Sequence, residues 1–189
     1  GVVQGGLQVT SRRCSLPIEV PYLRVANVFR DSLDLSEVKT IRVTETELKR
    51  ASLDEGDILI VEGHGNPSEI GRASTWDGSI RPCVHQNHLI RVQIDRCKAE
   101  PHFVSAFLNS AGGRGQLTSF AKTTSGLNTI STSNVMRIRV LLPPVAEQVR
   151  WSRTVGRYKA LARTNGAASQ VADELMSSLD ASGADVKRV

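Results

Sequence analysis

The chain has 189 residues, of which 40% are hydrophobic and 23% are charged, and its formal net charge is +5. This balance is typical of a soluble globular protein, and the length fits one compact domain with an appendage better than two full domains. No apolar run approaches the roughly 20 residues that a membrane span needs, which excludes a transmembrane helix.

The N-terminal segment, residues 1–15, has no charged leader followed by a long apolar stretch, so we expect a cytoplasmic protein. Cys14, Cys83 and Cys97 lie far apart without a CxxC spacing. This spacing argues against a disulfide framework and against a thiolate metal site, so we expect reduced thiols.

Charge is segregated along the chain. Residues 31–69 hold ten acidic and four basic residues, whereas residues 114–163 hold nine basic residues and one acidic residue, Glu147. The basic segment is either a solvated helix face or a surface for a polyanion.

The first predicted elements are strands and one helix. Residues 20–28 and 38–43 are rich in β-branched residues, and we expect them to form two strands of one sheet. Thr44 and Glu47 have the capping-box spacing, which predicts a short helix from Thr44 that ends before Gly56.

Residues 57–62, with the sequence DILIVE, predict a strand buried on both faces, and a glycine-containing loop follows it. Residues 76–79, WDGS, predict a turn in which Asp-Gly tolerates positive φ. Residues 83–94 predict one long strand whose polar centre, HQNH, interrupts an apolar pattern.

Pro101 is expected to begin a helix that the glycines of residues 112–115 end. Residues 116–134 are rich in Ser, Thr and Asn, which is typical of turns and capped helix ends. Residues 135–144 predict a final strand stopped by two prolines, which places a domain boundary near Pro144.

The sequence thus predicts a domain over residues 1–143, a long helix over 144–182 and a flexible tail over 183–189. Apolar residues recur along this helix at spacings of three and four, so we expect it to pack on another helix rather than to fold back. The residues of this seam are Val155, Tyr158, Ala162, Ala172, Leu175, Met176 and Leu179.

Two enzymatic motifs are incomplete. Asn66 and Pro67 resemble the start of the Asn-Pro-Pro-aromatic element of adenine methyltransferases, but Ser68 and Glu69 replace its last two residues. The glycines near residue 64 belong to no GxGxxG or GK[ST] pattern, so we expect no cofactor there.

Cys83, His85 and His88 are close enough in sequence to suggest zinc. On a strand, however, residues 83 and 85 share one face and residue 88 points to the other, so we expect no metal site. We also find no paired carboxylates, HExxH motif or evident Ser-His-Asp set, and we expect no catalytic residues.

The sequence does supply side chains that suit base edges: Asn and Gln fit adenine, and Arg fits guanine. For the HQNH segment, a hydrogen-bonded polar cluster that fixes neighbouring loops is slightly favoured over base contact. For Lys122 and Arg114 the alternatives are simple solvation and phosphate contact. The candidate DNA-contacting residues are Arg13, His64, Asn66, Arg72, Gln86, Asn87 and Lys122.

The segments PYLRVANV, GDILIVEGHGNPSEIGRA, CVHQNHLIRV, LNTIS and LLPPVAEQ, in this order, resemble the specificity (S) subunit of type I restriction-modification enzymes. The resemblance covers roughly residues 7–180. It implies an α/β (α+β) fold: a mixed-sheet target recognition domain for double-stranded DNA, followed by a long C-terminal dimerisation helix.

The resemblance also implies partners: a methyltransferase (M) subunit, a restriction (R) subunit indirectly, and a second recognition half or a homodimer through the helix. Catalysis would belong to those partner subunits, and this chain would need no cofactor. Two alternatives remain. The first is a non-enzymatic regulatory or assembly protein that binds an acidic protein through its basic helix, and the less favoured second is a self-contained methyltransferase or nuclease.

Overall fold

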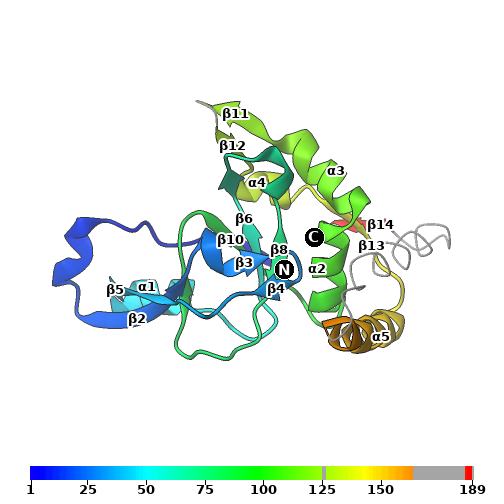
Figure 1. Cartoon of the computed structure of the whole chain (residues 1–189), viewed down its shortest axis with the longest axis horizontal. Helices are drawn as coiled ribbons and strands as arrows, with labels where there is room; N and C mark the ends of the chain where they lie inside the picture. Colours follow the sequence, from blue (N-terminus) through cyan, green and yellow to red (C-terminus); the bar gives the residue numbers. More distant parts are fainter. Residues whose placement is uncertain (125–126, 164–185, 189) are drawn as a thin grey trace.

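The computed structural model describes residues 1–124, 127–163 and 186–188 of the chain. At its centre lies an antiparallel sheet of order β1-β10-β6-β8. Its strands are β1 (Val2–Gly5), β6 (Ile58–Val61), β8 (Ala73–Thr75) and β10 (Leu89–Gln93). In Figure 1 this sheet stands between a lobe built from β2 (Ile18–Leu23), β5 (Lys39–Val43) and α1 (Glu45–Ala51) on one side and helices α2 (Pro101–Asn109) and α5 (Val145–Arg163) on the other.

The central strand β6 is buried along its whole length, as its continuous apolar sequence predicts. Side chains alternate across a strand, so Ile58 and Ile60 belong to one hydrophobic cluster while Leu59 and Val61 belong to another. The first cluster also contains residues of α2, such as Phe103, which explains why this strand carries no polar residue.

The second sheet has the order β5-β2-β9, with β2 (Ile18–Leu23) antiparallel to β5 (Lys39–Val43) and parallel to β9 (Val84–His85). The expectation that the first two strand segments share a sheet is therefore confirmed for β2 and β5. The end of the first segment differs, because residues 25–27 form a 3-10 helix and residues 28–29 pair in another sheet. Helix α1 (Glu45–Ala51) begins after Thr44, whose hydroxyl accepts from the Glu47 amide at 3.2 Å, while the Glu47 carboxylate accepts from the Thr44 amide at 3.0 Å. The capping box predicted from sequence is thus present.

The predicted long strand over residues 83–94 is wrong, because β9 and β10 belong to different sheets. A turn separates them, closed by the hydrogen bond from the Leu89 amide to the Gln86 carbonyl at 2.9 Å. The polar centre of the segment is this turn, which is why it interrupts the apolar pattern.

The boundary between two helices also differs from the sequence-based expectation. Helix α2 (Pro101–Asn109) ends at Ser110, whose amide donates to the Ala106 carbonyl at 3.0 Å and whose hydroxyl accepts from the Gly113 amide at 3.3 Å. The glycines therefore lie inside α3 (Ala111–Phe120) rather than terminating α2. At Gly113 a Cβ would lie 2.1 Å from the Phe107 carbonyl oxygen, so only glycine lets the two helices meet this closely.

The remaining elements are short, apart from the C-terminal helix α5 (Val145–Arg163), which begins after the two prolines as predicted. The predicted strand over residues 135–144 is reduced to β13, because residue 135 ends α4 and only three residues pair. Residues 186–188, within the predicted tail, form β14 antiparallel to β13. The short elements are η1 (Ser11–Ser15), η2 (Val25–Asn27), β3 (Val28–Phe29), β4 (Ser32–Leu33), β7 (Gly63–His64), η3 (Pro67–Glu69), β11 (Lys122–Thr124), β12 (Leu127–Thr129), α4 (Thr132–Val135), β13 (Arg139–Leu141) and β14 (Val186–Arg188).

None of the helices in the described part of the chain is both long and apolar enough to cross a membrane.

Candidate nucleic-acid interface

Three polar segments that are distant in sequence meet at one end of the central sheet. Leu89 at the start of β10 pairs with Val61 at the end of β6, so the segments that adjoin them, 86–88 and 62–69, leave the sheet together. The Glu62 amide donates to the His88 carbonyl at 3.0 Å. Strand β12 then pairs with β7 to give a small sheet of order β11-β12-β7. We call residues 62–69, 86–88, 122–124 and 127–129 the sheet tip; its strands β11 and β12 lie beyond the end of β6 in Figure 1.

The loop after β7 is folded by its own side chains. The backbone amide of Asn66 donates to His64 Nδ1 at 3.0 Å. The side-chain Oδ1 of Asn66 accepts from the Ser68 backbone amide at 3.0 Å and from the Ser68 hydroxyl at 2.9 Å. Because Nδ1 accepts, the neutral His64 ring carries its hydrogen on Nε2, which is then a donor. Asn66 uses its oxygen to cap η3, so its side-chain NH₂ group is the part suited to an external acceptor.

Gln86 and Asn87 are partly exposed at the tip, and their backbone is fixed by neighbouring segments. The Gln86 amide donates to the Leu23 carbonyl at 2.9 Å, and the Asn87 amide donates to the Leu7 carbonyl at 2.9 Å. The two partly exposed carboxamides are therefore carried by a turn whose backbone is fixed, which is the support that base reading requires.

His85 lies directly before this turn and is fully buried. Its Nδ1 lies 3.2 Å from the Ala51 carbonyl oxygen. Burial, assisted by the nearby Arg91 charge, lowers the pKa of His85 to about 4. His85 is consequently a neutral residue that ties the turn to the end of α1, which is the fixing role that the sequence left open for this segment.

Arg72 lies behind the tip with only 7% of its surface exposed. Its guanidinium donates to Glu69 Oε2 at 2.8 Å and to the Val25 carbonyl at 2.7 Å, and it stacks 5.1 Å from the centre of the Phe29 ring. The Arg72 hydrogen bond is also the main reason that the pKa of Glu69 is lowered. In this arrangement Arg72 fixes the base of the η3 loop.

Arg13 lies in the other lobe of the molecule. Its guanidinium forms a two-pronged contact with the Glu47 carboxylate, at 3.0 and 2.8 Å. This contact is the main cause of a lowered pKa at Glu47. The structure thus brings His64, Asn66, Gln86, Asn87 and Lys122, the first residue of β11, to the sheet tip, while Arg72 lies behind it and Arg13 lies apart. Base contact by any of the seven remains a prediction.

Cys83, His85 and His88, the three residues with a zinc-like spacing, lie in different surroundings. Cys83 is buried, its thiol donates to the Val84 carbonyl at 3.6 Å, and burial raises its pKa to about 12. His88 is exposed and its Nδ1 lies 3.9 Å from the Glu62 carboxylate, whereas His85 is buried against α1. Among the residues that the structure describes, no group of three or more His, Cys, Asp or Glu side chains is placed to hold a metal ion.

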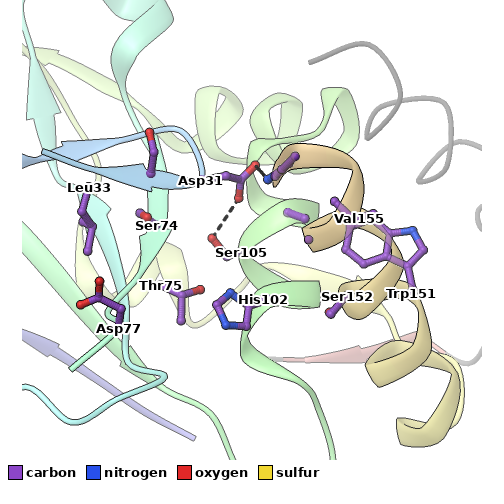
Figure 2. Close-up of a pocket in the computed structure, with 14 residues that line it drawn as sticks. Asp31, Leu33, Ser74, Thr75, Asp77, His102, Ser105, Trp151, Ser152 and Val155 are labelled. Atoms are coloured by element: carbon purple, nitrogen blue, oxygen red, sulfur yellow. Dashed lines mark hydrogen bonds and ion pairs between the residues drawn. The ribbon is translucent and has the colours of Figure 1, made fainter. Parts of the chain in front are cut away.

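A hollow of about 330 Å³ lies between the β3–β4 turn, β8 and helices α2 and α5, and Figure 2 shows its lining. It contains His102, Ser105 and Asp31, residue types that occur in hydrolytic triads. The Ser105 hydroxyl, however, donates to Asp31 Oδ1 at 3.3 Å, and that carboxylate also pairs with Lys159 at 3.1 Å. The hydroxyl is therefore committed to Asp31 rather than to a histidine base.

The first turns of α5 pack against the domain. Gln148 is fully buried; its Oε1 accepts from the Glu100 amide at 2.9 Å and its Nε2 donates to the Pro143 carbonyl at 2.7 Å. Trp151 meets Phe103 edge to face at 5.2 Å. These contacts, with those of Ser152, Val155 and Lys159, form what we call the helix anchor.

The predicted helix seam is divided by this anchor. Val155 is buried within the chain at 5% exposure, whereas Tyr158 is 52% exposed and is joined on the surface by Leu161 at 66%. Ala162 lies in the last turn of α5. Ala172, Leu175, Met176 and Leu179 lie outside the described residues. Pairing of two such helices remains a prediction.

Comparison with solved structures identifies the class of fold. The chain is similar to the crystal structure of the HsdS subunit from Thermoanaerobacter tengcongensis, with a TM-score of 0.59, 16% sequence identity, and coverage of 91% of this chain and 45% of that one. The α/β fold with mixed sheets and a C-terminal helix is therefore confirmed. No protein-family model matches the chain.

Sequence comparison then gives the family. The chain is 31% identical over 148 residues to the EcoKI specificity subunit of Escherichia coli (strain K12), covering 76% of this chain and 31% of that protein. It is 30% identical over 149 residues to the StySPI specificity subunit of Salmonella potsdam, covering 77% of this chain and 32% of that protein. The chain belongs to the type I restriction enzyme specificity subunits, and it spans about a third of the length of these relatives.

Proposed function

We propose that this chain is a DNA target recognition unit of a type I restriction-modification system. It reads a short sequence in double-stranded DNA and directs partner methyltransferase and restriction subunits to it. The observation that carries this proposal is the sheet tip, where three polar segments converge on a rigid turn and a small sheet.

The chemistry of the tip suits direct readout. A carboxamide can donate and accept at once, so Gln86 and Asn87 can each bond adenine N6 and N7 in the major groove. Asn66 and His64 offer donors, which suit the acceptor atoms of purines. Arg72 and His85 supply the stiffness beneath these side chains, since both are buried and bonded within the chain.

The test is selection of bound duplexes from a random-sequence DNA pool, with the full chain assembled with its methyltransferase partner. We expect an enriched motif, divided into two parts with a fixed gap because two recognition units read the site together. No enrichment at low salt would contradict the proposal. The affinity should fall steeply with salt, since phosphate neutralisation releases counterions.

We place methylation and cleavage in the partner subunits. The Asn66-Pro67 element lacks the aromatic residue, and Ser105, the serine beside His102 in the hollow of Figure 2, bonds Asp31. The purified chain alone should therefore transfer no methyl group to DNA. Methylation of a duplex by the chain without partners would overturn this division of labour.

We also infer that the exposed face of α5 pairs with a second recognition unit. Tyr158 and Leu161 lie three residues apart, which is the spacing of a helix-packing seam. Replacing both by Asp should halve the mass measured by light scattering, whereas the control R153D, also exposed on α5, should leave it unchanged. An unchanged mass for the double variant would exclude this face.

A second candidate function is binding of an acidic protein through the same helix. Arg150, Arg153 and Arg157 are all exposed on α5, at spacings that share one face. Replacing the three by Gln would abolish binding of an acidic partner, whereas assembly would survive if these arginines meet only DNA. Pull-down with the methyltransferase subunit distinguishes the two outcomes.

A further inference from the structure

A groove of about 550 Å³ lies beside the sheet tip, between the η3 loop and helix α3. The loop side is formed by Pro67, Ser68 and Ile70, and the helix side includes Gly115, Thr118 and Ser119. Two positively charged residues, Arg30 and Arg114, also line the groove.

Arg30 is held in place by the residues around the groove. Its guanidinium donates to the Ser68 carbonyl and, at 3.4 Å, to Asn109 Oδ1. Burial lowers the pKa of Arg30, and the nearby Arg114 charge lowers it further. A guanidinium nevertheless stays protonated in proteins, so two mutually repelling positive charges face one groove.

The carboxylates that act on Arg30 are already engaged. Glu69 pairs with Arg72 at 2.8 Å, and Asp31 pairs with Lys159 at 3.1 Å. Each of these carboxylates therefore has another cation as its closest partner. Among the residues that the structure describes, the positive charge at Arg30 and Arg114 has no carboxylate of its own, which favours an anionic ligand from outside the chain.

The helix wall of the groove contains Gly115, a residue type that lowers the stability of a helix and leaves open space beside it. Glycine is among the least favourable residues in a helix interior. Gly113 is explained by its contact with α2, but a Cβ added at Gly115 would meet nothing within 4 Å. Packing against the described part of the chain therefore gives no reason for Gly115, whereas close approach of a ligand backbone does.

The groove is continuous with the sheet tip on both sides. Its loop wall directly follows His64 and Asn66 in the sequence. Helix α3, which forms the other wall, ends at Phe120, two residues before β11 begins. Figure 1 shows α3 descending from the same end of the molecule as β11 and β12. An extended ligand at the tip would thus pass along the groove.

We propose that this groove binds the phosphate backbone of the DNA duplex that the sheet tip reads, with Arg30 and Arg114 as the phosphate contacts and Gly115 as the point of close approach. This proposal rests on the proposed function. The sequence alone left Arg114 open between solvation and phosphate contact and gave no signal for Arg30, because residues 30 and 114 become neighbours only in the fold.

The experiment measures binding of two labelled duplexes of equal length, the selected target and a scrambled sequence, to the full chain assembled with its methyltransferase partner. R114Q should weaken both duplexes by the same factor and reduce the slope of log K against log salt concentration by roughly 0.9. R114K should restore most of the binding, because a phosphate contact needs the charge more than the guanidinium shape. G115A should raise the melting temperature and weaken both duplexes.

The matched control is R12Q, an exposed arginine of η1 in the other lobe, which should change neither duplex. R30Q is measured together with its melting temperature, since Arg30 is partly buried. Arg114 is exposed, so its variants keep the test independent of folding.

The outcomes separate the two proposals. If the unmodified assembly binds the selected and scrambled duplexes equally, the proposed function fails. If it prefers its target and neither R114Q nor G115A alters affinity or the salt slope, the groove proposal alone is overturned. A change of preferred sequence in R114Q, with an unchanged salt slope, would overturn the phosphate assignment as well.

Discussion

The sheet tip and the helix anchor use similar polar residues in opposite ways. At the anchor, the Gln148 carboxamide is fully buried and both of its polar atoms are bonded within the chain. At the tip, Gln86 and Asn87 are partly exposed, and it is their backbone that the chain fixes. A carboxamide whose partners are internal stabilises the fold, whereas one held on a fixed backbone at the surface is available for a ligand.

The same contrast separates the arginines. Arg72 forms an ion pair with Glu69, and Arg13 forms one with Glu47, so both arginines stabilise the fold. Arg30 and Arg114 face a groove whose nearest carboxylates have other partners. Residue type therefore limits what a side chain can do, and the partners supplied by the fold decide what it does. Four predictions test this contrast.

The largest effect is expected at the anchor. Gln148→Leu leaves the Glu100 amide and the Pro143 carbonyl without partners, and each buried unsatisfied group costs about 1–3 kcal/mol. We expect a loss of roughly 2–4 kcal/mol in the free energy of unfolding, measured by urea denaturation, with the preferred DNA sequence unchanged. The exposed neighbour variant Glu147→Gln is the control, and a loss for Gln148→Leu no larger than for this control would remove the anchor's structural role.

The next effect is a pH dependence set by His85. Its folded pKa of about 4 lies below the ordinary value of 6.5, so the unfolded chain binds a proton more readily. Neutral His85 therefore makes its full contribution to the free energy of unfolding above pH 6.5. This contribution is lost as the pH falls from 6.5 toward 4, and the loss reaches up to about 3 kcal/mol. Urea titrations at pH 7 and pH 4.5 should show a smaller stability difference for His85→Gln than for the unmodified chain, while His102→Gln, which is exposed, should behave like the unmodified chain.

A third effect is expected at the tip, on sequence preference rather than on stability. Asn87→Ala and Gln86→Ala should each relax the preference at one base-pair position by about 1–3 kcal/mol. Their free energy of unfolding should change by less than about 0.5 kcal/mol, because the backbone bonds of the turn remain. Selection from a random-sequence pool measures the preference, with the exposed Gln8→Ala as control; a loss of stability with an unaltered motif would show that these side chains only shape the turn.

The smallest effect is expected at the edge of the anchor, where Lys159 pairs with Asp31 at 3.1 Å and the two side chains are 32% and 20% exposed. Partly exposed ion pairs contribute little, so Lys159→Ala should cost at most about 1 kcal/mol. The more exposed pair of Lys98 and Asp95 gives a matched control, Lys98→Ala, whose cost should be smaller still. Equal costs for the two variants would mean that the hollow beside α5 gives the pair no protection from solvent.

Local patterns in the sequence predicted much of the fold. Short-range signals predicted the capping box at Thr44, the doubly buried strand at residues 58–61, and the helix starts at Pro101 and after Pro144. The order of short segments also indicated the family, the type I restriction enzyme specificity subunits. The errors fall where long-range packing overrides local preference. Gly113 lies inside a helix because α2 and α3 must touch, and the segment at 83–94 breaks because its two halves join different sheets.

The sequence by itself thus determined the buried strand β6, the capped helix α1 and the starts of α2 and α5, the family of the chain, and the polar residues that could meet a base. Only the tertiary structure decided which of them share a surface, because strand pairing places residues 64, 87 and 128 at one end of the molecule and residue 13 in another lobe. It also decided that Arg72 is internal and that Arg30 and Arg114 face one groove, since burial and partner contacts are properties of packed neighbours and not of a linear pattern.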